Sequence, residues 1–128
     1  MADYAKLNLR DEVEDMAPKF DMPEGIEARF GRKSMGDSAL SGVSYFAYGP
    51  GFKTAFGHTH SEQEETYVVV EGGGTVRVGD EDVAVRAWDA IRIVPGAPHA
   101  IAAGPEGMAI IAFGAGPSDD TEMHQDYW

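Results

Sequence analysis

GHTHSEQEETYVVVEG, at residues 57–72, is the most informative part of this sequence. His58 and His60 stand two apart in a segment of alternating character, so both imidazoles are expected on one face of a strand. Glu65 lies five residues beyond His60, after the turn-like residues 61–63, and Thr66–Val70 reads as a buried strand. The pattern predicts two strands joined by a short turn, with two imidazoles and one carboxylate directed at the same place.

Short apolar segments alternate with turns on both sides of this stretch. Sixteen glycines and seven prolines are scattered along the chain rather than clustered, which is typical of an all-β fold. The Gly72–Gly74 run is expected to end one strand, and Gly104–Gly107 is expected to form a turn. The expected strands are 26–32, 41–48, 52–60, 66–70, 75–78, 83–86, 90–94, 99–102 and 108–113. So many short strands predict a barrel or jelly roll.

A short helix is expected within the N-terminal segment 1–20. Asn8 would cap it, and Pro18 would end it. Its apolar face would consist of Leu9, Val13 and Met16.

The tail 114–128 is expected to be irregular. Tyr127 and Trp128 are candidates for an apolar latch that docks against the barrel, and His124 is expected to be an ordinary exposed residue.

His99 completes a set of four candidate metal ligands with His58, His60 and Glu65. It follows the Pro95–Gly96 turn, at the start of an expected strand. Three imidazoles and one carboxylate suit one divalent ion such as Zn, Fe, Mn, Ni or Co, and an octahedral shell would keep two positions open. Two alternatives stay open: Glu64 competes with Glu65 as the carboxylate ligand, and His99 could be a metal-free structural residue.

The stretch 57–72 resembles the first motif of the cupin superfamily, which runs H-x-H, three or four residues, E, six residues, G. The segment around His99 resembles the second motif, roughly G, five residues, P-x-G, two residues, H, three residues, N. Three positions depart from that pattern: Trp88 replaces the first Gly, Val94 the Pro and Ala103 the Asn. These departures concern the turn more than the metal ligand.

The resemblance implies a double-stranded β-helix, commonly dimeric, with metal ligands at His58, His60, Glu65 and His99. It implies a single domain over 1–128 with its core at 41–113. Cupins include dioxygenases, isomerases, decarboxylases, seed-storage proteins and ligand-sensing domains, so the fold does not choose the reaction. The favoured hypothesis is a metal-dependent dioxygenase, isomerase or lyase acting on a small organic molecule, in which Glu65 could also take a proton. The alternative is a non-catalytic binding or sensing module.

Composition limits the remaining choices. The net charge of -12 disfavours a nucleic-acid partner, and no apolar run is long enough to span a membrane. The absence of cysteine fits a reducing cytoplasm, where we expect a homodimer.

Five aromatic residues are expected in the core or a dimer interface, with one or two lining a cavity: Tyr45, Phe46, Tyr48, Phe52 and Phe56. Three cations could anchor an anionic substrate or form salt bridges: Lys53, Arg77 and Arg92.

Overall fold

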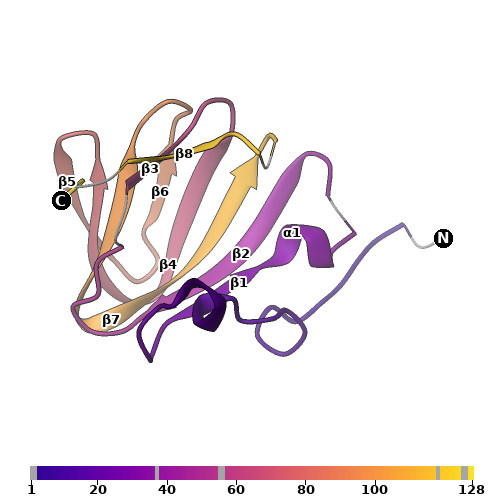
Figure 1. The fold of residues 1–128 in the computed structure, drawn as a ribbon, viewed down its shortest axis with the longest axis horizontal. Helices are drawn as coiled ribbons and strands as arrows, with labels where there is room; N and C mark the ends of the chain where they lie inside the picture. The colour runs from indigo at the N-terminus through magenta and orange to yellow at the C-terminus, as the bar shows by residue number, and fades with distance from the viewer. Residues whose placement is uncertain (1–2, 37, 55–56, 118, 125–126) are drawn as a thin grey trace.

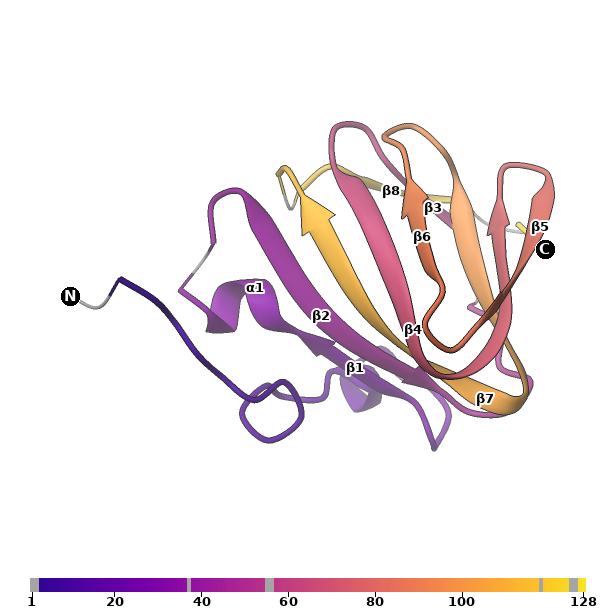
Figure 2. The same cartoon turned by 180° about the vertical axis from the view of Figure 1, so that it is seen from behind.

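Eight antiparallel strands form one curled sheet in the computed structural model, which describes residues 3–36, 38–54, 57–117, 119–124 and 127–128 (Figure 1, Figure 2). The strands are β1 (Glu27–Phe30), β2 (Ser41–Tyr48), β3 (Gly57–His60), β4 (Glu64–Val78), β5 (Glu81–Arg86), β6 (Ala90–Ile93), β7 (His99–Ala115) and β8 (Thr121–His124). Two short helices accompany them, η1 (Ala17–Phe20) and α1 (Gly31–Ser34). The predicted all-β, barrel-like architecture is confirmed. None of the helices in these ranges is long and apolar enough to cross a bilayer.

The two long strands β4 and β7 pair along most of their length and organise the sheet. The first half of β4 pairs with the second half of β7, from Glu64 opposite Ala115 to Gly72 opposite Met108. The second half of β4 continues along the start of β7, to Val78 opposite His99. The buried core lies mainly on these two strands and includes Val69, Val76, Ile101, Met108 and Ile110. This pairing brings the start of β7 to the same end of the molecule as β3, where His58 pairs with His99.

The expected strand break at Gly72–Gly74 is wrong, because β4 runs through it with register shifts between Val69 and Glu71 and between Gly72 and Gly74. A Cβ on Gly74 would lie 2.1 Å from the Ala102 carbonyl oxygen, so glycine permits a close approach of two backbones here. The turn expected at 104–107 likewise lies inside β7. Glycine at these positions bends the strands instead of ending them.

The expected N-terminal helix is also wrong. Asn8 closes a local turn, in which its side-chain oxygen accepts hydrogen bonds from the N–H groups of Arg10 and Asp11. Within the described residues 3–20, helical structure appears only in the 3-10 helix η1, later than expected. The carboxylate of Asp15 accepts hydrogen bonds from the N–H groups of Ala17 and Ala28, at 3.0 and 2.9 Å. These bonds tie the N-terminal segment to β1, and a continuous helix would not make them.

Asp15→Ala is therefore expected to lower the melting temperature by about 4 °C at neutral pH, because it leaves two N–H groups without their acceptor. Partial burial opposes ionisation of Asp15, but the two backbone hydrogen bonds outweigh it and lower its pKa. The stabilisation is thus complete above the ordinary pKa of aspartate and is lost as the pH falls through the lowered value. Thermal melts of wild type, Asp15→Ala and the control Asp11→Ala, compared at pH 7 and pH 3, measure this difference. A difference that grows in acid would contradict it.

The tail was expected to be irregular, and this too is wrong, because β8 pairs antiparallel with β3 from Gly57 opposite His124 to His60 opposite Thr121. The pairing satisfies backbone groups on an otherwise open edge of β3. His124 was expected to be exposed, but it is half-buried, and its Nε2 contacts the Thr59 hydroxyl.

Tyr127 and Trp128 dock against the barrel as expected, and hydrogen bonds hold them there. The Tyr127 hydroxyl lies 2.8 Å from each of the Gly79 and Pro98 carbonyl oxygens. Trp128 Nε1 donates to the Thr54 carbonyl at 2.9 Å. The end of the chain is thereby fixed beside the barrel wall.

Candidate metal centre

Four side chains from three strands meet at one end of the barrel. His58 and His60 come from β3, Glu65 from the start of β4 and His99 from the start of β7. Glu65 Oε2 lies 3.4 Å from His58 Nε2, 3.3 Å from His60 Nε2 and 2.8 Å from His99 Nε2. One ligand atom from each residue lies within 4.8 Å of all the others. The structure thus brings together all four residues that the sequence singled out.

Glu64 and Glu65 are adjacent in β4, so their side chains point to opposite sides of the strand. Glu65 shares its side of the strand with the buried residues Tyr67 and Val69, and its carboxylate therefore points inward. Glu64 lies on the opposite side, where its Oε2 pairs with Arg92 Nη1 at 2.9 Å. Of the two candidate carboxylates, only that of Glu65 lies at the cluster.

Hydrogen bonds behind the cluster orient three of its side chains. Asp120 Oδ1 lies 3.0 Å from His60 Nδ1, and the Ala97 carbonyl oxygen lies 2.9 Å from His99 Nδ1. The Tyr67 hydroxyl donates to Glu65 Oε2 at 3.0 Å. Each Nδ1 donates its proton to the partner behind it, so the Nε2 lone pairs of His60 and His99 face the cluster. Metal-bound histidines in proteins commonly have such partners.

Asp120 lies directly behind the cluster, although the sequence did not single it out. Its side chain is only 5% exposed, and its Oδ2 accepts the N–H groups of Glu62 and Gln63 at 2.8 and 2.7 Å. It therefore holds the turn between β3 and β4 as well as the ring of His60. Nothing in the sequence marks it, because it lies in an acidic tail with no fixed spacing to the histidines.

The cluster fits a divalent ion by the chemistry of its donors. His60 Nε2 is buried and has no hydrogen-bond partner among the described residues, although Glu65 lies nearby. A buried nitrogen without a partner costs free energy, and three imidazole nitrogens cannot all be satisfied by one carboxylate oxygen. An ion bound by all four residues would use every one of these lone pairs.

The local electrostatics keep the carboxylates ionised. Burial alone would raise the pKa of Glu65, but the three neighbouring imidazoles outweigh it and hold that pKa well below its usual range. Burial lowers the pKa of His58, whereas the neighbouring Glu65 raises that of His60. Burial would also raise the pKa of Asp120, but the two backbone N–H groups and His60 lower it strongly. The negative charge needed to attract a cation is therefore present at neutral pH.

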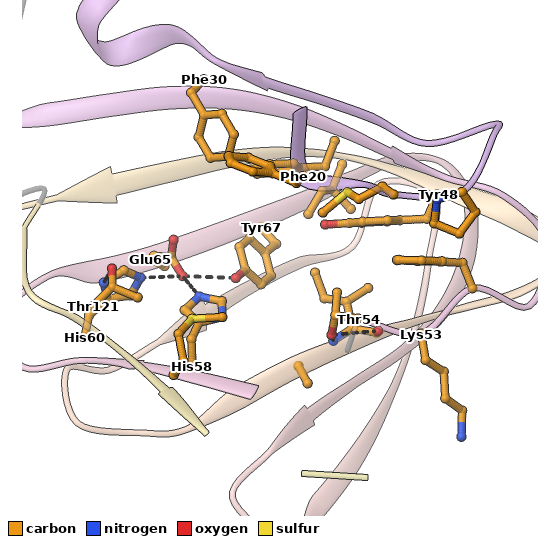
Figure 3. A pocket seen from close by; sticks show the side chains of 18 of the residues that line it. Phe20, Phe30, Tyr48, Lys53, Thr54, His58, His60, Glu65, Tyr67 and Thr121 are labelled. Carbon is orange, nitrogen blue, oxygen red and sulfur yellow. Dashed lines mark hydrogen bonds and ion pairs between the residues drawn. The ribbon is translucent and has the colours of Figure 1, made fainter. Parts of the chain in front are cut away.

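A cavity of about 690 Å³ adjoins the cluster, and aromatic rings form a large part of its wall (Figure 3). His58, His60 and Glu65 form one side of it. Its aromatic lining consists of Phe20, Phe30, Phe46, Tyr48, Phe52 and Tyr67. One or two of the five aromatic residues named from the sequence were expected to line a cavity, and three of them do: Phe46, Tyr48 and Phe52. The cluster is open to a space that can hold a small molecule.

The other residues named from the sequence lie elsewhere. Tyr45 does not line this cavity, and the Arg10 guanidinium lies 5.5 Å from the centre of its ring. Phe56 lies outside the described residues. Arg77 pairs with Asp82, and Arg92 pairs with Glu64, so both form salt bridges. Lys53 alone of the three cations lines the cavity, at its exposed rim.

The turn before β6 forms despite the departure at Trp88. Trp88 adopts φ 74°, the left-handed conformation that glycine adopts without strain, and its side chain is 77% exposed. Its N–H still donates to the Val69 carbonyl at 2.7 Å. The backbone geometry of the turn therefore tolerates tryptophan at some cost in strain, and His99 still reaches the cluster.

Asp120→Asn is expected to weaken metal affinity by about 10-fold to 100-fold while the protein stays folded. Asparagine has one side-chain oxygen and no negative charge. It therefore cannot accept hydrogen bonds both from His60 and from the two backbone N–H groups. Zinc affinity measured by competition with a chromophoric chelator tests this, with Asp119→Asn on the exposed neighbour as control. Equal affinities of the two variants would show that Asp120 does not orient His60.

Solved structures with the same fold come from several bacteria, and no protein of curated function matches the chain in sequence. A cupin protein from Bacteroides fragilis is 19% identical over 93% of this chain and 89% of that chain, with a TM-score of 0.73. Streptomyces PAC13, in a variant solved with uridine, is 18% identical over 94% and 90%, with a TM-score of 0.70. Oxalate decarboxylase from Bacillus subtilis is 19% identical over 95% of this chain and 32% of that chain, with a TM-score of 0.77. Identities this low establish a shared fold only.

The sequence profile of the cupin domain matches residues 44–113, more than half of the 128 residues. The matched segment contains both motifs and all four clustered residues. The curled antiparallel sheet and its structural relatives agree with this match. The chain therefore belongs to the cupin domain family.

Proposed function

We propose that this protein is a metal-dependent enzyme that acts on a small organic molecule held in the aromatic cavity. The observation that carries the proposal is the position of the cluster, since His58, His60 and Glu65 line the same cavity as the aromatic rings. Three imidazoles and a carboxylate suit the divalent ions of Fe, Mn, Ni, Co and Zn. The ion would supply Lewis-acid chemistry at the inner end of the cavity.

Each residue of the cluster has a defined part in this proposal. His58, His60 and His99 would hold the ion through Nε2, with Asp120 and the Ala97 carbonyl fixing two of the rings from behind. Glu65 would balance charge and, as the only carboxylate of the four, is our candidate to accept a proton from the substrate, as a weak base because its pKa is lowered. The Tyr67 hydroxyl holds Glu65 Oε2 in place for both roles.

The reaction classes that we propose are those of a dioxygenase, an isomerase or a lyase. All three can use a substrate oxygen held beside the ligand cluster and a group that moves a proton. An enzyme, oxalate decarboxylase, shares the fold, which is compatible with the proposal.

The test is turnover of a panel of diketones, flavonols, small acids and keto-sugars by protein loaded with each of the five ions. Product formation by wild type, abolished in Glu65→Gln and retained in Glu64→Gln, would support the proposal. A panel left unchanged by protein of confirmed metal content would oppose it. A small molecule recovered unaltered from the cavity would then favour a binding or sensing module.

We also propose a cytoplasmic homodimer that binds no nucleic acid. The absence of cysteine supports the location, and the net charge of -12 supports the lack of nucleic-acid binding. Membership of the cupin family, whose members are commonly dimeric, supports an interface between copies. Sedimentation velocity of the full chain tests the dimer, and a monomer at micromolar concentration would refute it.

A further inference from the structure

The hydroxyl of Tyr48 is a hydrogen-bond donor that faces the cavity. Tyr48 ends β2, is only 9% exposed and lines the cavity wall. Figure 3 shows its hydroxyl end directed toward the side where Tyr67 and Glu65 lie. In the part of the chain that the structure describes, this hydroxyl has no hydrogen-bond partner, whereas that of Tyr67 bonds to Glu65. Among the described residues, the buried side-chain atom without a partner is His60 Nε2, so the Tyr48 hydroxyl is open to the cavity, where a bound molecule can accept its proton.

The wall around this hydroxyl is a continuous series of rings. The ring of Tyr48 stacks on Phe52, with centroids 5.6 Å apart and planes 5° from parallel. It also stacks on Phe46, at 6.3 Å and 11°. Phe30 meets Phe46 edge to face at 5.2 Å, and Phe20 extends the series beyond Phe30. A flat aromatic molecule packs against such a wall with large contact and favourable ring geometry.

Few polar atoms of the wall are free to bind a ligand rich in hydroxyl groups. The Thr54 hydroxyl already accepts from the Ile101 N–H and lies near the Ile101 carbonyl. The charged groups of Asp21 and Lys53 lie on exposed residues at the rim. Each hydroxyl buried without a partner would weaken binding by about 10-fold, so a sugar-like ligand would bind poorly.

We propose that the cavity binds a flat aromatic compound with a carbonyl or similar acceptor oxygen, and that Tyr48 donates its hydroxyl proton to that oxygen. The proposal rests on the small-molecule function proposed above and narrows its substrate class. Phe46 and Phe52 position the ring system, and the Tyr48 hydroxyl selects the oxygen. Tyr48 is thus a specificity residue outside the metal cluster.

The test uses 2-acetonaphthone as the probe and 2-isopropylnaphthalene as a hydrocarbon of the same shape without the oxygen. Calorimetric titration of the full chain is expected to show tighter binding of the ketone. Tyr48→Phe should weaken ketone binding by about 5-fold to 10-fold and leave hydrocarbon binding unchanged, because only the hydrogen bond is lost. Phe52→Ala should weaken binding of both probes. The melting temperature of Tyr48→Phe should not fall, since the hydroxyl has no partner within the described structure.

Tyr45→Phe is the matched control, because Tyr45 lies on the same strand and does not line the cavity. It should change neither affinity. Equal effects of Tyr48→Phe on both probes, no effect on either, or tighter binding of uridine than of the ketone would each overturn the proposal.

Metal content measured in the same samples separates this inference from the proposed enzyme. Ketone binding by protein that takes up no metal would refute the metal-dependent function and support the role of Tyr48. Metal-loaded protein that fails to bind the ketone would refute the proposed class of aromatic ligand, and it would not count against the proposed metal site.

Discussion

Glu65→Gln is expected to weaken affinity for divalent metal by about 100-fold or more, because it removes the only carboxylate of the four ligands. Glu65 Oε2 lies 2.8–3.4 Å from the Nε2 atoms of all three clustered histidines. Glutamine has nearly the same shape, so the variant should fold, but its neutral amide neither balances the ion's charge nor binds as strongly. Competition titration with zinc against a chromophoric chelator measures the loss.

The neighbouring residue provides the control for this variant. Glu64→Gln makes the same chemical change one position away, on the face of β4 where Glu64 pairs with Arg92. This exposed pair contributes little stability, and the variant should bind zinc as wild type does. If Glu64→Gln lost metal affinity and Glu65→Gln kept it, the inward phase assigned to β4 would be wrong.

Gly74→Ala is expected to destabilise the fold by about 3 kcal/mol, which would lower the melting temperature by about 10 °C. The added Cβ would lie 2.1 Å from the Ala102 carbonyl oxygen and 3.0 Å from the Ala103 Cα. Both atoms belong to the backbone of β7, so no side-chain rotation relieves the clash. The two central strands would have to separate where their register shifts.

Gly49→Ala is the matched control, because a Cβ there would meet only the Gly25 carbonyl oxygen, at 3.8 Å. Its melting temperature should stay close to that of wild type. Thermal unfolding followed by circular dichroism compares the two variants. A Gly74→Ala protein as stable as Gly49→Ala would contradict the close approach of β4 and β7.

The four clustered residues were predictable because strand alternation and motif spacing mark them. Alternation places His58 and His60 on one face, and family spacing links them to Glu65 and His99. The choice between Glu64 and Glu65 was not predictable from alternation alone, because a turn of uncertain geometry precedes them. It depends on the pairing of β4 with β6 and β7, which fixes the inward side.

The misses have a common physical cause, which is pairing between distant segments. β8 forms because β3 has an edge to pair with, although its own sequence has little strand character. Asp120 reaches His60 only through that pairing. The glycines at 72–74 break strands in most contexts, but here they permit two backbones to approach closely. Local propensity contains none of this information.

The decisive measurement is the metal content of the full chain, expressed without an affinity tag and purified without chelator. Elemental analysis is expected to find about one divalent ion per chain in wild type. His58→Ala should lose the ion and melt at a lower temperature, since a bound ion stabilises the folded state. Wild-type protein that holds no ion after incubation with each of Zn, Fe, Mn, Ni and Co, and melts like His58→Ala, would show that the four side chains do not form a metal site.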